Sequence, residues 1–282
     1  MALRLVIDSA SDITVEEANE HGWVLLPLTV TIGDKEYRDG VDITPDRFYD
    51  MLVESDELPH TSQLTPADYE SAFEKILAEG DTPFVITLSS KLSGTYQSAC
   101  IAAEACEAKP IVADSLSAAF GEAIFIRYAD SLINQGMEAE ELAKVLNEVR
   151  YKIRILALLD TLEYLRKGGR ISAAVEFAGS LLQIKPVIGV ENGEVVMVGK
   201  ARGSKKGNNL LNEIVKKGNG IDFSKPYSLA YTGNSRGYLE KYVEDSRSLW
   251  ESETDDLPVM RIGATIGTHI GPGAIGVVFF EK

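Results

Sequence analysis

The order of short apolar runs and helix-like segments in the first half of the chain constrains its fold most. LRLVID (3–8), FVITL (84–88) and PIVAD (110–114) are typical of buried strands. Each is followed by a polar loop and then by a segment with helical periodicity. Repetition of this strand–loop–helix order predicts a parallel sheet covered by helices.

The second half predicts a different sheet. KPVIGVENGEVVMVG reads as strand–turn–strand with Asn192-Gly193 at the turn, and ILALLD, YSLAYT, VMRIG and AIGVVFF read as further strands. We therefore expect an α/β protein of two domains. Residues 1–150 would form an α/β/α domain with a parallel sheet, and residues 151–282 a second α/β domain with a mixed sheet. The strand at 24–32 is a candidate for pairing in the second domain.

Composition excludes several classes of protein. A net charge of −15 and a pI of about 4.7 disfavour binding to nucleic acid and to anionic membrane surfaces. No apolar run approaches the length of a membrane span, and the first apolar run is too short for a signal peptide. Cys100 and Cys106 lie six residues apart in a helical segment, which suits neither a disulfide nor a zinc site. We expect a cytoplasmic protein without stable membrane insertion.

Hydroxyl side chains follow three of the predicted parallel strands. The carboxyl ends of such strands form the ligand crevice of an open α/β sheet, and a loop that opens a helix also favours an anion. The alternative is that these side chains only cap helices and stabilise turns. The hydroxyl side chains are Ser9 and Ser11, then Ser89, Ser90, Ser93 and Thr95, then Ser115 and Ser117.

Familiar cofactor and nucleophile motifs are missing. The chain has no G-x-G-x-x-G after a strand, no G-x-x-x-x-G-K-[ST] and no G-x-S-x-G. The three histidines, His21, His60 and His269, show no metal-ligand spacing. We therefore expect neither a metal nor a cofactor.

His269 stands in GTHIGPGAIG (267–276), a stretch rich in glycine. Its ring could act as a catalytic base, a metal ligand or a polar ligand contact, or simply occupy a turn. The sequence around it supplies no partner that selects one of these roles.

Three further segments are candidates for binding. Arg170 in KGGRIS follows two glycines that permit close backbone approach, or that merely cap a helix. The hydroxyls of TSQ (61–63) are spare, because Thr65 is the expected N-cap of the next helix. The run KARGSKK could dock an acidic partner or be a solvated face; its basic residues are Lys200, Arg202, Lys205 and Lys206.

Together these motifs resemble one family. DGVDI with FYDML, TSQ, SSKLSGTYQSA, LEYLRKGGRIS, IKPVIGV and GTHIGPGAIG resemble the DegV family of bacterial fatty-acid-binding proteins, in the family's order and over nearly the whole chain. One departure is Leu64, where the family usually has proline after TSQ. We expect this change to loosen the loop without removing a hydroxyl.

The resemblance implies a long-chain fatty acid, similar to palmitate or oleate, held between the two domains. It also implies that the protein is not itself an enzyme but presents the carboxylate to a separate ATP-dependent fatty acid kinase, whose acyl phosphate feeds phospholipid synthesis. Carried over by motif, the carboxylate contacts fall on Thr61, Ser93 and His269, with Ser62 and Gly94 close by.

The remaining roles are less specific. Arg170 and the basic run would serve the cavity mouth or kinase docking, and residues 173–184 are a candidate tunnel wall. Two alternatives stay open: a stand-alone acyl-ester hydrolase or transferase using Ser93 and His269, and a ligand-sensing module whose output is a protein contact.

Overall fold

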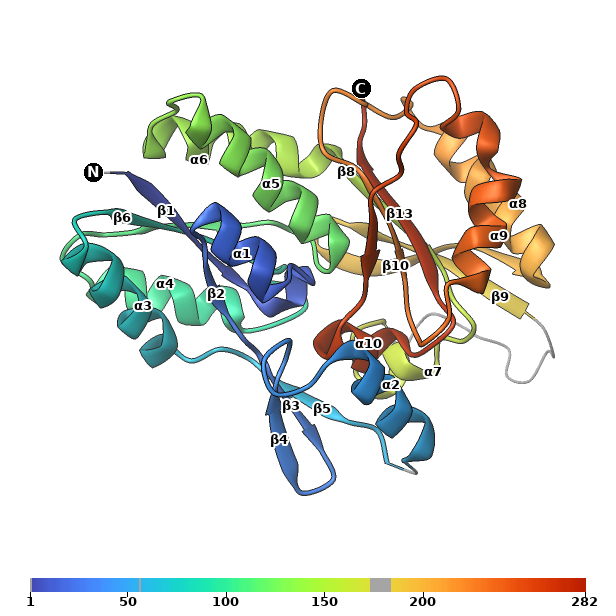
Figure 1. Ribbon diagram of the computed structural model, residues 1–282, viewed down its shortest axis with the longest axis horizontal. Coiled ribbons are helices and arrows are strands. Elements are labelled where there is room, and N and C mark those ends of the chain that lie inside the picture. Colours follow the sequence, from blue (N-terminus) through green and yellow to red (C-terminus); the bar gives the residue numbers. More distant parts are fainter. Residues whose placement is uncertain (1, 56, 173–183) are drawn as a thin grey trace.

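Figure 1 shows the computed structural model, which describes residues 2–55, 57–172 and 184–282. Most of the candidate tunnel wall at 173–184 lies outside the described residues, and only Ile184 at the start of a strand is included.

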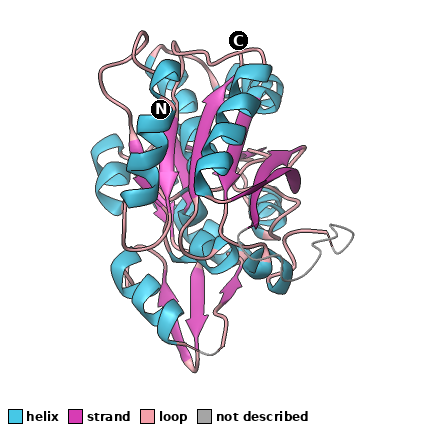
Figure 2. Cartoon of the chain, turned by 90° about the vertical axis from the view of Figure 1, so that its right-hand side faces the viewer, coloured by secondary structure: helices cyan, strands magenta, loops and turns pink. Residues whose placement is uncertain are grey.

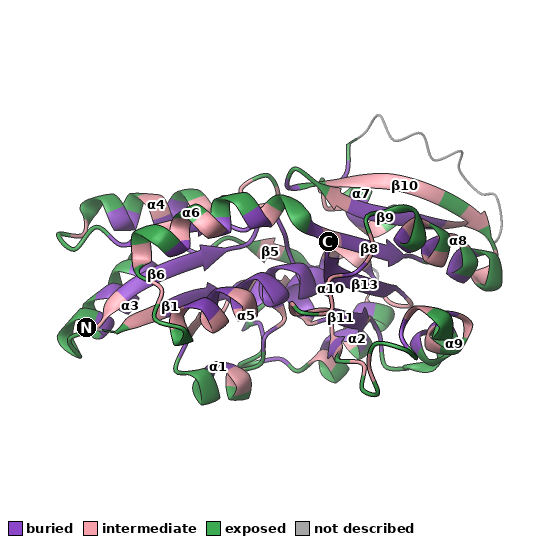
Figure 3. Cartoon of the chain, turned by 90° about the horizontal axis from the view of Figure 1, so that it is seen from above, coloured by how far each residue is buried: buried purple, intermediate pink, exposed green. Residues whose placement is uncertain are grey.

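The first half forms the predicted parallel sheet. Its order is β2-β1-β6-β7 and every pair is parallel. Helices α3 and α4 lie on one side of this sheet, with α1 and α5 on the other (Figures 1 and 3). The strands are β1 (Leu3–Asp8), β2 (Val24–Leu26), β6 (Thr82–Thr87) and β7 (Ile111–Asp114). The helices are α1 (Val15–His21), α3 (Pro66–Ala78), α4 (Thr95–Ala105), α5 (Phe120–Asn134) and α6 (Ala139–Val149).

The second half forms a mixed sheet of order β10-β9-β8-β13-β11-β12, in which only the β11–β12 pair is parallel. Asn192 and Gly193 have φ of 51° and 86°, the two positive values that a tight hairpin turn requires. The strands are β8 (Ile153–Leu158), β9 (Ile184–Glu191), β10 (Glu194–Arg202), β11 (Ser228–Tyr231), β12 (Val259–Arg261) and β13 (Ile275–Phe280). Helices α8 (Ser204–Lys217) and α9 (Gly237–Asp245) cover one face (Figure 1).

The run at 24–32 does not pair with the second sheet. It is divided at Pro27, which has no N–H to donate to a ladder. Its first part, β2, joins the parallel sheet, and its second part, β3 (Thr29–Ile32), lies between β4 (Lys35–Arg38) and β5 (His60–Ser62) in a small antiparallel sheet. This sheet projects from the body of the molecule beside α2 (Pro45–Glu54) (Figures 1 and 2).

The two large sheets share one core. Helix α5 contacts β1 of the parallel sheet and β8, β11 and β13 of the mixed sheet. The largest hydrophobic cluster accordingly contains residues of both halves, among them Phe84, Ile155 and Phe280. The chain leaves the parallel sheet after β7, runs through α5 and α6, and enters the mixed sheet at β8 after a turn of 3-10 helix, Arg150–Lys152. Division into domains at residue 150 stays a prediction, since the core is continuous there.

Two short helices of the second half complete the description. These are α7 (Glu163–Lys167) and α10 (Ala264–Ile270), and α10 contacts α2, α7, β3, β5 and the 3-10 turn Ser9–Ser11. Among the described helices, none has both the length and the apolar character of a membrane span.

Candidate functional site

A cavity lies where the two large sheets and the small sheet meet. About 200 Å³ of it is open to the centre of a water molecule, far above the 10–15 Å³ or so that one water needs in this measure. Its lining comes from β5, the loop before α4, the start of α5, β8, β9, β10, the loop after α7, and α10. Segments from both halves of the chain therefore enclose one space.

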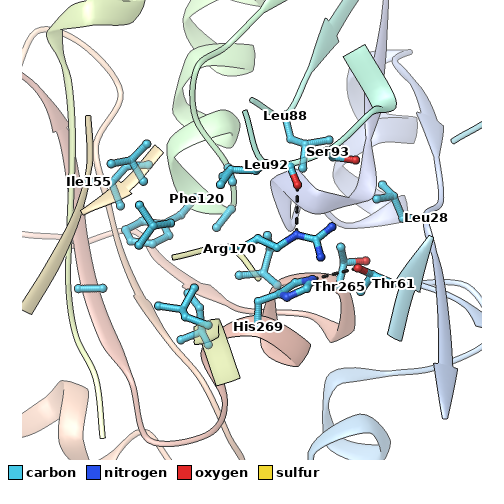
Figure 4. Close-up of a pocket in the computed structure, with 18 of the residues that line it drawn as sticks. Leu28, Thr61, Leu88, Leu92, Ser93, Phe120, Ile155, Arg170, Thr265 and His269 are labelled. Atoms are coloured by element: carbon cyan, nitrogen blue, oxygen red, sulfur yellow. Dashed lines mark hydrogen bonds between the residues drawn. The ribbon is translucent and has the colours of Figure 1, made fainter. Parts of the chain in front are cut away.

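All six predicted ligand residues line this cavity. Polar side chains gather at one end, where Thr61, Ser93, Arg170, Thr265 and His269 lie near one another (Figure 4). Ser62, Gly94 and Gln63 complete this polar end. Their roles as ligand contacts stay predictions.

The other end of the cavity is apolar. Phe120 and Ile155 lie there, away from the polar side chains (Figure 4). Small or branched side chains on the strands widen the space and keep it apolar. Leu28, Leu88 and Leu92 lie beside the polar side chains in Figure 4. The other apolar lining residues are Ala118, Ala119, Ala157, Leu165, Ile188, Val190, Val195, Ile266 and Ile270.

His269 lies in the last turn of α10 and not in a glycine-rich turn as its surroundings suggest. The helix ends immediately after it, because Gly271 takes φ 74° and Pro272 follows. The glycine before it serves packing: a Cβ on Gly267 would lie 2.6 Å from Cε1 of Phe48. The first part of GTHIGPGAIG is therefore the end of a close-packed helix, and the glycines and proline after His269 terminate that helix.

The imidazole of His269 is neutral at neutral pH. Burial, together with the nearby Arg170 guanidinium, lowers its pKa from 6.5 to about 4. Nε2 lies 2.9 Å from Oγ1 of Thr61, across 208 residues of sequence. Nδ1 is buried and has no hydrogen-bond partner among the described residues. A neutral ring with one such bond is suited to orienting a polar group.

The His269 ring packs against Gly168. A Cβ on Gly168 would collide with Nδ1 of His269, so only glycine leaves room for the ring. The two glycines of KGGRIS thus differ, because Gly169 has φ 71° and no neighbour at its Cβ position.

The start of α4 faces the polar end. Oγ of Ser93 lies 3.0 Å from Oγ1 of Thr95, and the N–H of Thr95 donates to Ser93 Oγ at 3.3 Å. Gly94 is the N-cap residue, and a Cβ there would overlap the Gln63 amide. The first N–H groups of a helix and its dipole favour an anion at this point.

Arg170 is held by backbone carbonyls. Its Nε donates to Leu92 O at 3.2 Å and its Nη1 to Gly168 O at 2.7 Å, so the guanidinium is tethered beside the head of the cavity (Figure 4). Its charge contributes to the lowered pKa of His269.

Leu64 does not loosen the TSQ loop. Its side chain is 4% exposed within the main core, and its N–H donates to Thr95 Oγ1 at 3.4 Å. Proline could not make that bond. Thr65 caps α3 with a full capping box, as expected, which leaves the Thr61 hydroxyl for the cavity.

Thr265 is a cavity residue that the sequence analysis missed. It precedes His269 by four residues on α10, and its Oγ1 is buried without a hydrogen-bond partner among the described residues. The i, i+4 spacing from His269 was the available signal, but it requires knowing that this glycine-rich stretch is helical.

Comparison with known proteins identifies the family. A family model described as "Uncharacterised protein, DegV family" matches residues 2–282. A DegV domain-containing protein of Caldanaerobacter subterraneus is 35% identical over 284 residues, which cover 99% of each chain. The chain belongs to the DegV family.

Two solved DegV structures are close to this one. A structure from Thermus thermophilus, described as fatty acid binding of a DegV family protein, has a TM-score of 0.88 and 30% identity, with all of each chain covered. A structure of DegV from Bacillus subtilis, described as a fatty acid binding protein, has a TM-score of 0.84 and 29% identity, again with all of each chain covered. The α/β fold with one parallel and one mixed sheet is thus the DegV fold.

The basic run of this DegV chain lies apart from the cavity. Lys200 and Arg202 are on β10 and Lys205 and Lys206 on α8, and all four are exposed. Val195, at the other end of β10, lines the cavity, and seven residues of strand separate it from Arg202 by roughly 23 Å. Of these predicted basic residues, Arg170 lines the cavity, and its role at the cavity mouth stays a prediction.

Ser93 and His269 are each bonded elsewhere. The Ser93 hydroxyl pairs with Thr95 and the His269 Nε2 with Thr61, and among the described residues no hydrogen bond joins Ser93 to His269. A serine nucleophile needs its base within hydrogen-bond reach, so this arrangement does not favour ester hydrolysis. Within the same residues, no group of three His, Cys, Asp or Glu side chains is placed to hold a metal ion.

Proposed function

We propose that this DegV-family protein binds a long-chain fatty acid, with its carboxylate among Thr61, Ser93 and His269 and its tail at the apolar end of the cavity. The observation that carries the proposal is the division of one cavity into a polar and an apolar end. Fatty acid binding by the related proteins of Thermus thermophilus and Bacillus subtilis supports the ligand class.

Burial of the tail supplies the affinity. A palmitate-like chain has about 14 methylenes, each contributing roughly 0.8 kcal/mol on burial, which totals on the order of 11 kcal/mol before ordering costs. The head group can then be held by neutral donors whose task is orientation.

Mass spectrometry of the organic extract of denatured protein tests this proposal. We expect fatty acid in near-stoichiometric amount, or uptake of added palmitate or oleate by delipidated protein. Neither bound fatty acid nor uptake would overturn it. Ala157→Phe, which fills space on the β8 wall of the cavity, should reduce uptake of long chains more than of short ones.

We further propose that the bound carboxylate is presented to a separate ATP-dependent fatty acid kinase, whose acyl phosphate feeds phospholipid synthesis. Hydroxyls and a neutral imidazole leave a carboxylate nucleophilic, whereas a bidentate arginine clamp would neutralise it. The Arg170 guanidinium, tethered to two carbonyls, fits a flanking position.

His269→Ala separates presentation from binding. We expect kinase-dependent acyl phosphate formation to fall by a larger factor than oleate affinity, because the ring orients the head group and the tail dominates affinity. His60→Ala is the matched control, since His60 is exposed on the same strand as Thr61 and does not line the cavity. Equal losses of both quantities would mean that His269 is structural.

Docking through the basic run is tested by charge reversal. Arg202→Glu should raise the concentration needed for half-maximal acyl phosphate formation without changing oleate affinity. Arg247→Glu reverses an exposed arginine elsewhere on the second half and serves as the control. Unchanged kinase response in Arg202→Glu would reject docking at this run.

A further inference from the structure

Helix α10, which carries His269, is held at its start by carboxyl groups from the other half of the chain. Asp39 Oδ1 accepts the N–H of Ala264 and its Oδ2 accepts the N–H of Thr265, both at 3.0 Å. Asp12 Oδ1 accepts the N–H of Gly263 at 2.7 Å. Three successive N–H groups are thus bound by two side chains that lie more than 220 residues away in sequence.

These bonds lie at the start of the helix whose face lines the cavity. Thr265, whose N–H is bound by Asp39, and His269 are four residues apart and therefore lie on one face, about 6 Å apart along the helix axis. Both line the polar end, where Figure 4 places them beside Thr61. The Thr265 hydroxyl is buried beside the Asp39 carboxyl but makes no hydrogen bond of normal geometry among the described residues, so it can donate to a head group instead.

We propose that Asp39 is a positioning residue that places Thr265 and His269 at the polar end of the cavity, and that Thr265 is a further contact for the bound carboxylate. The second part rests on the proposed function, whereas the first concerns the ligand-free protein.

The two carboxyls are not equivalent. Both oxygens of Asp39 accept an N–H, which requires the ionised form, whereas Oδ2 of Asp12 is buried with no partner among the described residues. Both Oδ1 atoms lie close together, at 3.1 and 3.2 Å from the Cβ position of Gly263, so ionising both is costly. Burial raises the pKa of each, and that of Asp12 lies well above its usual value, also because of Asp39. Tyr49 of α2, Arg261 of β12 and Glu122 of α5 are further titratable groups nearby.

Paired amide substitutions exploit this difference. In Asp12→Asn the remaining carbonyl oxygen still accepts from Gly263, so oleate affinity should stay within about twofold of wild type. In Asp39→Asn an amide NH₂ faces a backbone N–H, so oleate affinity should fall about tenfold, the loss expected for a bond to a charged group. Thr265→Val, of nearly the same shape, should weaken oleate severalfold while leaving Asp39 bound to α10.

The decisive readout uses ligand-free protein. In ¹⁵N NMR spectra, Asp39→Asn should shift the His269 ring nitrogens and the Ala264 and Thr265 amides, and Asp12→Asn should leave the His269 ring unchanged. If Asp39→Asn lowers only the melting temperature, with His269 and oleate binding per folded molecule unchanged, the positioning role is wrong. Equal effects of the two substitutions would also overturn it.

Two further results are possible: the Asp39→Asn variant does not fold, or the wild-type protein binds no fatty acid. If Asp39→Asn does not fold, carboxyl ¹³C shifts of the wild-type protein at pH 7 decide: an ionised Asp39 beside a protonated Asp12 supports the proposal, and the reverse overturns it. If wild-type protein binds no fatty acid, the proposed function and the Thr265 contact fall together, while the His269 shifts still test the positioning role.

Discussion

At the scale of single residues, the geometry of the polar end of the cavity depends on an uncharged histidine ring and on a glycine whose missing side chain leaves room for it. His269 is uncharged because burial lowers its pKa to about 4, so it can orient a carboxylate without pairing with it as an ion. Its ring fits only because Gly168 has no side chain. The absence of a Cβ at Gly168 therefore shapes the polar end of the cavity just as the hydroxyl side chains there do.

Gly168→Ala tests this packing. The added methyl would collide with Nδ1 of His269, so we expect the ring to move from Thr61 and oleate affinity to fall about tenfold, a cost typical of overpacking. Gly237→Ala is the control: it lies in α9, its nearest Cβ neighbour is Ser235 Oγ at 3.4 Å, and alanine favours helix. Unchanged oleate binding by titration in Gly168→Ala would show that the ring adapts.

At the scale of elements, the hairpin of β9 and β10 joins the mixed sheet to the loop before α4. Ser89 Oγ donates to Gly193 O at 2.8 Å, so the hairpin tip lies against the segment that carries Ser93 and Gly94. The same hairpin contributes Ile188, Val190 and Val195 to the apolar lining. The hairpin therefore lines the cavity with apolar side chains, and its turn contacts the loop that carries the polar residues.

Gly193→Ala should destabilise this contact. Alanine would be strained at φ 86°, and its Cβ would lie 2.5 Å from Ser89 Oγ. We expect the free energy of unfolding to fall by about 1–3 kcal/mol, measured by urea denaturation. Gly136→Ala has a similar φ of 89° and no neighbour at Cβ, so it reports the backbone strain alone. Equal losses in the two variants would mean that the hairpin contact contributes nothing.

At the scale of the whole molecule, acidic groups are buried where the layers meet. Asp8 and Glu122 are fully buried beside each other between β1 and α5, and Asp39 is buried at the start of α10. Burial raises the pKa of Asp8 to about 7 and that of Glu122 well above its usual value. Stability is therefore linked to pH at neutrality.

The direction in which stability changes with pH follows from Asp8 and His269, whose contributions oppose each other. The raised pKa of Asp8 contributes stability that is complete below about pH 3.8 and is lost as pH rises through 7. The lowered pKa of His269 contributes stability that is complete above about pH 6.5 and is lost as pH falls through 4. The two oppose each other between pH 4 and 6.5, and above 6.5 only the buried acids act.

We therefore expect the free energy of unfolding to fall between pH 6.5 and 8, with on the order of 1 kcal/mol of the loss from Asp8 and a further loss from Glu122, whose pKa in the folded state is also raised. Urea denaturation at both pH values measures it. Asp8→Asn cannot ionise at this position and should make the dependence less steep, while Glu122 still contributes. A free energy that rises over this range would contradict the assignment of a raised pKa to Asp8.

Much of the architecture could be predicted from the sequence. The apolar runs at β1, β6 and β7 set strand positions, Asn192-Gly193 set the hairpin, and Thr65 set the start of α3, because each signal is carried by neighbours along the chain. The motifs also brought the six cavity residues together by family resemblance, although their contacts with a ligand stay predictions.

Only the tertiary structure decided the rest. The helical state of His269, the splitting of 24–32 at Pro27 and the binding of α10 by Asp12 and Asp39 depend on packing between distant segments. Local periodicity cannot report such packing, since it describes which face of an element is buried but not against what. The sequence by itself determined most of the elements and the family. The contact of Thr61 with His269, 208 residues apart, exists only because three sheets close around one cavity.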